Sequence, residues 1–285
     1  MEQRRLGDRT VGAIGLGGMP MSVREENDEA LAVRTIHAAL DAGVTLIDTA
    51  DAYSLSEEEF GHNEELIARA LREYGAGADD VVVATKGGHT RSGTEWHLDG
   101  RPEYLRQACE GSLQRLGVEA IGLYQHHRPD PEVDYAETLG GLKALLDDGL
   151  ILRAGISNAD PDQIRLAHEV LGEGLVAVQN EFSPRFRTSQ AELDLCDELG
   201  IAFLPWSPLG GMGSAADLGD RFAPFAEVAA AHDVSPQRVA LAWELAKSPV
   251  VIPIPGASRV ESVLDSVAAT QLRLSTDELA RLDAS

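Results

Sequence analysis

VVVATK at 81–86, TLID at 45–48 and AIGLYQHH at 120–127 are mainly apolar or β-branched runs, and each ends in a charged or imidazole side chain. Short runs of this kind predict β-strands that are buried on both faces of a parallel sheet. Other strand-like runs are GAIGLG (12–17), ILRAGIS (151–157), LVAVQN (175–180), IAFLPWS (201–207) and VVIPIPG (250–256). The chain therefore has eight predicted strands.

Amphipathic segments of helical length separate these strands, near 28–42, 61–74, 102–116, 134–148, 160–171, 189–199, 222–247 and 259–270. Strict alternation of strands and helices predicts a parallel sheet with crossover helices. An open doubly wound sheet is the competing fold, but eight apolar strands without a separate substrate domain favour closure. We therefore predict an α/β protein, a (β/α)8 TIM barrel in one domain over residues 1–285.

Smaller signals mark the ends of these elements. RRL (4–6) and TVG (10–12) flank Gly7-Asp8 and predict an N-terminal β-hairpin that closes the bottom of the barrel. Asn27 or Asp28 is expected to cap the first helix. The chain ends at Ser285, soon after the last predicted helix, so no long C-terminal loop is expected beside the pocket.

Composition excludes several classes of protein. The formal net charge of −23 repels nucleic acids and anionic membrane surfaces. No apolar stretch approaches the roughly 20 residues of a membrane span, and the N-terminus lacks a signal-peptide core. We expect a cytoplasmic protein with no nucleic-acid or membrane partner, whose oligomeric state the sequence does not indicate. Cys109 and Cys196 are expected to be ordinary, partly buried thiols.

Polar residues follow most of the predicted strands. They are Asp48, Lys86, His126-His127, Ser157-Asn158, Gln179-Asn180 and Ser207. A barrel is packed inside and carries its active site at the carboxyl ends of its strands. Because these polar groups follow six strands, we expect them to meet at one rim as an active site.

The chemistry of this rim suggests proton donation to a carbonyl group. Tyr53, in the loop after Asp48, has a reference pKa near 10, which is too high for efficient acid catalysis unless its phenolate is stabilised. The Lys86 ammonium can stabilise the phenolate, and Asp48 can hold that ammonium in place. His127 can then donate a hydrogen bond to a carbonyl oxygen. Since none of these side chains donates a hydride, a cofactor must be the reductant.

The chain resembles an aldo-keto reductase over its whole length. The family's signature segments occur in order as LIDTADAY (46–53), GHNEELIARAL (61–71), ATKGG (84–88), GLYQHHRPD (122–130), GISN (155–158), VQNEFS (178–183), PWSPLGG (205–211) and PIPGASR (253–259). The resemblance implies reduction of a small-molecule aldehyde or ketone to an alcohol. It implies a catalytic tetrad of Asp48, Tyr53, Lys86 and His127, with Tyr53 as proton donor, and it favours His127 over His126.

The same resemblance implies a nicotinamide site. Ser157, Asn158 and Gln179 would hold the carboxamide, and Trp206 would stack on the ring. Further expected cofactor contacts are Gly18, Met19, Asp48, Ser207, Pro208, Leu209 and Gly210, of which Ser207, Leu209 and Gly210 would wrap the pyrophosphate through their backbone. Glycine-rich backbone suits this because its amides approach phosphate closely.

The last predicted strand and helix depart from the family pattern. Gly256 and Ser262 stand where the family commonly has the lysine and arginine that bind the 2′-phosphate of NADPH. Arg259 remains as a nearby cation, beside Ser258. Asp265 and Ser266 are expected at the adenine, where the family often has Glu-Asn. We therefore expect NADPH as cofactor, with NADH left open.

The substrate pocket has less support from the sequence. Without a long C-terminal loop, specificity is expected to come from Met19, Trp96, Arg128 and the segment after Pro208.

Several alternatives are weaker. GLGGMP (15–20) has proline where a dinucleotide fingerprint needs glycine, and no HxH or HExxH spacing supports a metal site. A Schiff-base role for Lys86 would need a depressed pKa, which Asp48 opposes. A sensor or structural protein that binds nicotinamide without turnover is the alternative function, but it would have no need of Tyr53 and Lys86 together.

Overall fold

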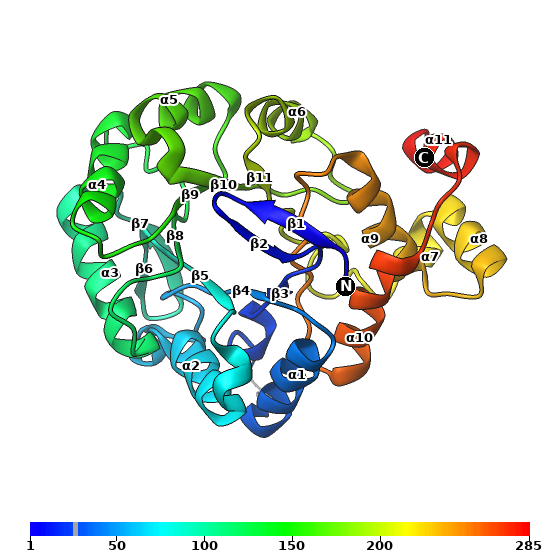
Figure 1. Ribbon diagram of the computed structural model, residues 1–285, viewed down its shortest axis with the longest axis horizontal. Helices are drawn as coiled ribbons and strands as arrows, with labels where there is room; N and C mark the ends of the chain where they lie inside the picture. The colour runs from blue at the N-terminus through cyan, green and yellow to red at the C-terminus, as the bar shows by residue number, and fades with distance from the viewer. Residues whose placement is uncertain (25–27) are drawn as a thin grey trace.

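The computed structural model describes residues 1–24 and 28–285. Its centre is a curled parallel sheet of seven strands in the order β11-β10-β9-β8-β5-β4-β3, around which the helices form a ring (Figure 1). In chain order the strands are β3 (Leu16–Gly17), β4 (Leu46–Asp48), β5 (Val82–Gly87), β8 (Leu123–His126), β9 (Ala154–Ser157), β10 (Leu175–Gln179) and β11 (Ala202–Phe203). The predicted parallel α/β architecture is therefore confirmed.

The segment 251–256 connects the two edges of this sheet. Isolated parallel bridges pair Val251 with Phe203 of β11 and Gly256 with Gly17 of β3. We predicted a regular eighth strand here, and the prediction is wrong in that respect. Pro253 and Pro255 have no N–H to donate, so on the β3 side their carbonyls only accept, from the Gly15 and Gly17 amides. On the other side, the Ile252 and Ile254 amides donate to the Phe203 and Pro205 carbonyls. The sheet is barrel-like, with an irregular segment in the eighth position.

Helices surround the sheet, and on one side further helices pack against that ring (Figure 1). They are α1 (Glu29–Asp41), α2 (His62–Tyr74), α3 (Pro102–Leu116), α4 (Tyr135–Asp147), α5 (Pro161–Leu171), α6 (Gln190–Leu199), α7 (Leu218–Arg221), α8 (Ala223–His232), α9 (Pro236–Lys247), α10 (Val260–Ala268) and α11 (Thr276–Asp283). Asp28 caps α1 by accepting from the Leu31 amide, whereas Asn27 lies outside the described residues.

The single helix predicted over 222–247 is wrong, because two helices, α8 and α9, occupy that range. Asp233 adopts a left-handed backbone with φ of 55° and ends α8. Ser235 then caps α9, whose first residue is Pro236. Proline suits the first position of a helix but breaks a helix interior, so the chain restarts here instead of continuing.

Two hairpins lie outside the main sheet. β1 (Gln3–Leu6) and β2 (Arg9–Gly12) pair antiparallel and lie across the middle of the ring (Figure 1). Leu6 and Val11 are fully buried in the same core cluster as inward-facing strand residues such as Leu123. The second hairpin, β6 (His89–Ser92) and β7 (Glu95–Leu98), was not predicted. It follows β5 directly and therefore lies beside the residues that follow Lys86.

Among the helices of the described residues, none combines the length and the apolar character that crossing a membrane requires. Cys109 and Cys196 are free thiols, as expected, but both are fully buried, whereas we expected partial burial.

Glu244 is an unusual member of the α9 core. Its side chain is fully buried, and neither carboxylate oxygen has a hydrogen-bond partner in residues 1–24 or 28–285. Burial raises the pKa of Glu244 well above its ordinary value, because a charged carboxylate loses its solvation there.

We expect Glu244→Gln to stabilise the protein at neutral pH. The raised pKa means that the contribution of Glu244 to stability is fully present below the unfolded pKa near 4.5 and is lost as pH rises, by about 1.4 kcal/mol per pH unit up to the folded pKa. Urea unfolding at pH 5 and pH 8 should show a gap between the two proteins that widens with pH. Glu119→Gln, at an exposed glutamate, is the matched control. Parallel pH profiles for wild type and Glu244→Gln would contradict this assignment.

Candidate active site

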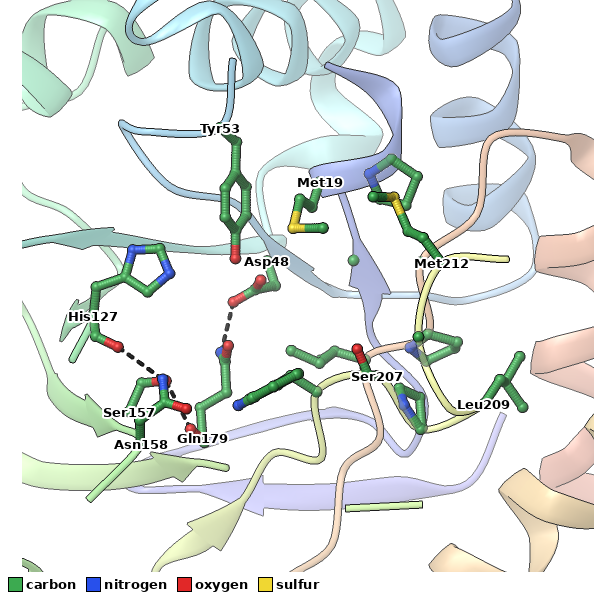
Figure 2. A pocket seen from close by; sticks show the side chains of 18 of the residues that line it. Met19, Asp48, Tyr53, His127, Ser157, Asn158, Gln179, Ser207, Leu209 and Met212 are labelled. Atoms are coloured by element: carbon green, nitrogen blue, oxygen red, sulfur yellow. Dashed lines mark hydrogen bonds between the residues drawn. The ribbon is translucent and has the colours of Figure 1, made fainter. Parts of the chain in front are cut away.

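A cavity of about 380 Å³ opens at the carboxyl ends of the strands (Figure 2). Of the predicted tetrad, Asp48, Tyr53 and His127 line it, and Lys86 lies fully buried behind them. Across the part of the chain that the structure describes, no group of three or more His, Cys, Asp or Glu side chains is placed to hold a metal ion.

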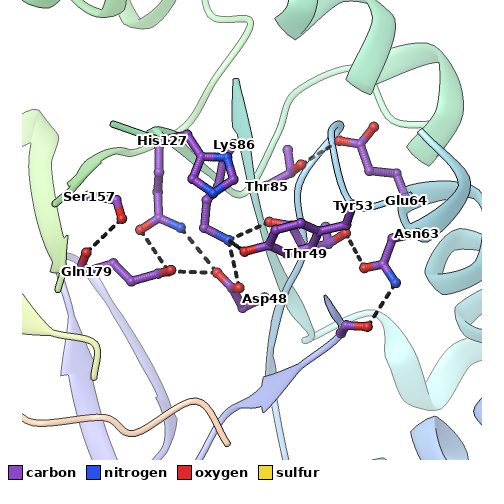
Figure 3. Close-up of polar contacts among 12 residues, drawn as sticks. Asp48, Thr49, Tyr53, Asn63, Glu64, Thr85, Lys86, His127, Ser157 and Gln179 are labelled. Atoms are coloured by element: carbon purple, nitrogen blue, oxygen red, sulfur yellow. Dashed lines mark hydrogen bonds and ion pairs between the residues drawn. The ribbon is translucent and has the colours of Figure 1, made fainter. Parts of the chain in front are cut away.

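Lys86 organises the tetrad through three hydrogen bonds. Its Nζ donates to Asp48 Oδ2 at 2.7 Å, to the Thr49 carbonyl at 2.7 Å and to the Tyr53 hydroxyl at 3.0 Å (Figure 3). Burial alone would lower the pKa of Lys86, but Asp48 and Tyr53 outweigh burial and raise it. The lysine therefore stays an ammonium, which is unsuited to Schiff-base chemistry.

Two glutamines hold the other oxygen of Asp48. Gln179 Nε2 donates to Asp48 Oδ1 at 2.7 Å, and Gln125 Nε2 lies 3.4 Å from the same atom. Gln125 was missed in the sequence. The alternation of side chains along a strand could have found it, since Gln125 shares the inward face of β8 with Leu123 and precedes His127 on that face.

The same alternation separates the two neighbouring histidines. His127 faces the cavity, with its ring 5.6 Å from that of Tyr53. His126 points outward, lies 5.8 Å from the ring of Tyr135 and is fully buried. Burial lowers the pKa of His126 to about 3. Of these two histidines, His127 is therefore the one that lines the cavity.

His127 is held neutral. Burial, then the charge of Lys86, lowers the pKa of His127 well below its ordinary value. Its Nδ1 is enclosed without a hydrogen-bond partner among the described residues, whereas Nε2 is not among the enclosed atoms. A neutral imidazole that keeps Nε2 toward the cavity can act as a hydrogen-bond donor to an oxygen bound there.

The pKa of Tyr53 differs from our expectation that Lys86 would lower it. Burial raises the pKa of Tyr53 above 10, and the effect of Lys86, which lowers it, does not overcome burial in this structure. Tyr53 therefore carries its proton at neutral pH. The ammonium at 3.0 Å is still placed to stabilise a phenolate once that proton leaves.

The residues expected at the nicotinamide lie on one side of the cavity. Ser157 Oγ donates to the Gln179 carbonyl at 2.7 Å, and Asn158 Nδ2 donates to Ser157 Oγ at 2.9 Å. Asn158 has a left-handed backbone with φ of 57° and also donates to the His127 carbonyl. Trp206 lines the same cavity, and its buried Nε1 has no acceptor among the described residues.

The segment 207–213 forms another wall of the cavity. Ser207, Pro208 and Leu209 line it, and so do Gly211, Met212 and Gly213 of the segment after Pro208, whereas Gly210 is not among the lining residues. Gly211 and Gly213 have φ of 95° and 86°, and a Cβ atom added at Gly213 would meet nothing within 4 Å. Backbone of this kind lets amides approach a phosphate closely, but the expected contact of Ser207, Leu209 and Gly210 with a pyrophosphate stays a prediction.

The residues that we expected to bind the adenosine part of the cofactor do not all lie at the cavity. Gly256 lines the cavity, Arg259 is exposed at the N-cap of α10, and Ser258 lies beside Arg24, whose Nη1 is 3.4 Å from Ser258 Oγ. Arg24 also lines the cavity and was missed, because no local pattern pairs it with residue 258.

Five of the expected adenosine residues do not line the cavity, namely Ser258, Arg259, Ser262, Asp265 and Ser266. Asp265 instead bonds Arg238 at 2.7 Å and accepts from Ser235, so its carboxylate is engaged between α9 and α10. Ser266 Oγ donates to the Ser262 carbonyl within α10. Any contact of these residues with adenine stays a prediction. Gly18, expected at the cofactor, donates its amide to the Asp48 carbonyl and lies beside the wall that Met19 forms.

Met19, Trp96 and Arg128, expected at the substrate, all line the cavity. Trp96 comes from β7, and the ring of His89 on β6 lies 5.3 Å from it and 4.3 Å from His127. His89 was missed as a cavity residue. Gly93, with φ of 57° between the two strands, was the signal for the hairpin that delivers it.

Comparison with known proteins matches residues 13–285 to the Aldo/keto reductase family. An uncharacterised oxidoreductase of Schizosaccharomyces pombe is 35% identical over 98% of this chain and 88% of its own length. A probable aldo-keto reductase of Glycine max is 34% identical over 94% of this chain and 82% of its own.

Among solved structures, an aldo/keto reductase from Klebsiella pneumoniae in complex with NADP and acetate superposes with a TM-score of 0.83. It is 27% identical and the match covers 99% of this chain and 94% of that one. The tetrad geometry and these similarities over the full length agree, and the chain belongs to the aldo/keto reductase family.

Proposed function

We propose that this protein is an NADPH-dependent reductase that converts an aldehyde or ketone to an alcohol. The observation that carries the proposal is the buried Lys86 ammonium, bonded to both Asp48 and the Tyr53 hydroxyl beside a cavity that His127 also lines. A phenol with an adjacent ammonium and a neutral imidazole is suited to polarising and protonating a carbonyl oxygen.

In this proposal each side chain has one task. Neutral His127 donates a hydrogen bond to the carbonyl oxygen and orients it toward Tyr53. The Tyr53 O–H bond breaks as its proton passes to that oxygen, and the Lys86 ammonium stabilises the phenolate that remains. Asp48 holds the ammonium in place. When bound, the nicotinamide cofactor supplies the hydride that none of these side chains can donate.

The residues around the cavity support a nicotinamide cofactor. Ser157, Asn158 and Gln179 offer amide and hydroxyl groups for a carboxamide, and the open backbone of 211–213 suits a pyrophosphate. Arg24 and Arg259, near Ser258, offer cations for the 2′-phosphate of NADPH. The Klebsiella pneumoniae relative holds NADP, which favours the same cofactor here.

The direct test is to incubate the protein with NADPH or NADH and a reactive aromatic aldehyde, and to follow loss of absorbance by the reduced nicotinamide. We expect aldehyde-dependent oxidation with NADPH preferred. Binding of a cofactor without any turnover would instead support the alternative of a nicotinamide-binding sensor or structural protein.

Replacement of Tyr53 by Phe should lower kcat by about 10²–10⁴-fold, because it removes the proton donor without changing the ring. NADPH binding, followed by tryptophan fluorescence, should change little. Tyr74→Phe, which removes a distant exposed hydroxyl bonded to Asp41, is the control. Unchanged turnover in Tyr53→Phe would remove Tyr53 as the acid.

Replacement of Arg259 by Ala should weaken NADPH more than NADH, because only NADPH carries a 2′-phosphate to pair with the guanidinium. A lost charge-assisted hydrogen bond predicts a rise of roughly tenfold in the KM for NADPH. Arg34→Ala, at an exposed arginine of α1, changes the net charge equally and serves as control. If Arg259→Ala raised both KM values alike, Arg259 would not distinguish the two cofactors.

A further inference from the structure

The cavity carries charge of the opposite sign to the whole protein. The chain has 47 acidic and 24 basic residues. Yet the only carboxylate among the described residues that line the cavity is Asp48, which is bonded to the Lys86 ammonium. The guanidinium groups of Arg24 and Arg128 also line it. The walls of the site are therefore net positive, which favours anionic ligands.

The two arginines lie at different parts of the cavity. Arg24 reaches Ser258, next to the N-terminus of α10, where the proposed function places the 2′-phosphate of the cofactor. Arg128 directly follows His127 and bonds Asn158, so it lies at the catalytic end. A nicotinamide carboxamide is uncharged and can be held by the amide and hydroxyl groups already present. The cofactor therefore leaves the charge of Arg128 unexplained.

Arg128 has spare hydrogen-bonding capacity. Its one hydrogen bond within the described residues runs from Nη2 to Asn158 Oδ1 at 3.2 Å, and no described carboxylate lies within ion-pair distance of it. The charge of Arg128 has only a small effect on Glu181. Burial raises the pKa of Glu181, and the charges of Arg185 and Arg128 offset this rise only in part. A guanidinium with free N–H groups is matched to the two oxygens of a carboxylate.

A neutral aromatic wall lies near the catalytic end. His89 packs edge-on against His127 at 4.3 Å, and Trp96 packs against His89 at 5.3 Å. Burial lowers the pKa of His89 to about 4, with a contribution from Arg128, so its ring is uncharged at neutral pH. The wall can contact the apolar part of a substrate. Because His89 is uncharged, it does not compete with Arg128 for a negatively charged group of that substrate.

We propose that the substrate is an aldehyde or ketone that also carries a carboxylate, and that Arg128 binds this carboxylate while Tyr53 and His127 meet the carbonyl oxygen. The inference rests on the proposed reductase function and gives it a substrate class. The carboxylate takes no part in the chemistry. It selects and orients the substrate, and Arg128 is a specificity-determining residue.

The test compares 4-carboxybenzaldehyde with its neutral methyl ester, methyl 4-formylbenzoate, as substrates with NADPH. Wild-type protein should prefer the carboxylate by about tenfold or more in kcat/KM, mainly through KM. Arg128→Met should bring this ratio close to one, whatever happens to the absolute rates. Arg34→Met, which removes the same charge from an exposed site on α1, should leave the ratio unchanged.

A further variant protects the test against misfolding of Arg128→Met. Arg128→Lys retains a point charge but loses the planar fork, so it should show an intermediate preference. A wild-type ratio of one or below, or a preference that survives in Arg128→Met, would overturn the inference.

Binding without turnover separates this inference from the proposed function. In the presence of NADP, 4-(hydroxymethyl)benzoate should bind wild-type protein at least fivefold more tightly than its methyl ester, measured by tryptophan fluorescence, and Arg128→Met should lose that difference. If neither aldehyde were reduced but this difference were present, the reductase proposal would fail while the carboxylate site stood. Equal binding of the two alcohols to wild-type protein would refute the carboxylate site even if both aldehydes were reduced.

Discussion

The buried ion pair between Lys86 and Asp48 is the interaction on which the site depends. A fully buried ammonium loses the solvation of water, which is costly unless every N–H finds an acceptor. Here the three acceptors are Asp48, the Thr49 carbonyl and Tyr53, all on β4 or in the loop that follows it. Satisfying one lysine of β5 therefore fixes the path of the chain after β4 and places the Tyr53 hydroxyl.

The barrel-like sheet makes this pair possible by stacking a polar layer on an apolar one. β4 and β5 are parallel neighbours, with Asp48 in register with Ala84, so Lys86 extends past the end of that register toward the cavity. Below it, inward side chains such as Leu46, Val82 and Leu123 form a dry core together with the β1–β2 hairpin. Gln125 and Gln179 complete the polar layer around Asp48.

Few of the titratable groups in the site carry a charge at neutral pH. Burial keeps His126 and His127 uncharged, and it keeps Tyr53 protonated. The Asp48–Lys86 pair cancels internally, so the cationic character of the cavity comes from its arginines. A proton donor beside a fixed ammonium, in a cavity with cationic walls, suits the proposed reduction of a carbonyl compound that carries a carboxylate.

The sequence by itself determined the parallel α/β architecture and the polar residues that follow its strands, such as Asp48, Lys86 and His127, because apolar runs that end in polar side chains are a local pattern. Tertiary structure alone decided which distant groups meet: Gln125 at Asp48, His89 at His127, Arg24 at Ser258, and Asp265 at Arg238 instead of the cavity. It also decided that the segment 251–256 joins the two sheet edges through isolated bridges at Val251 and Gly256. Such contacts depend on how helices and loops pack around the sheet, and the periodicity of a single segment carries no information about its distant neighbours.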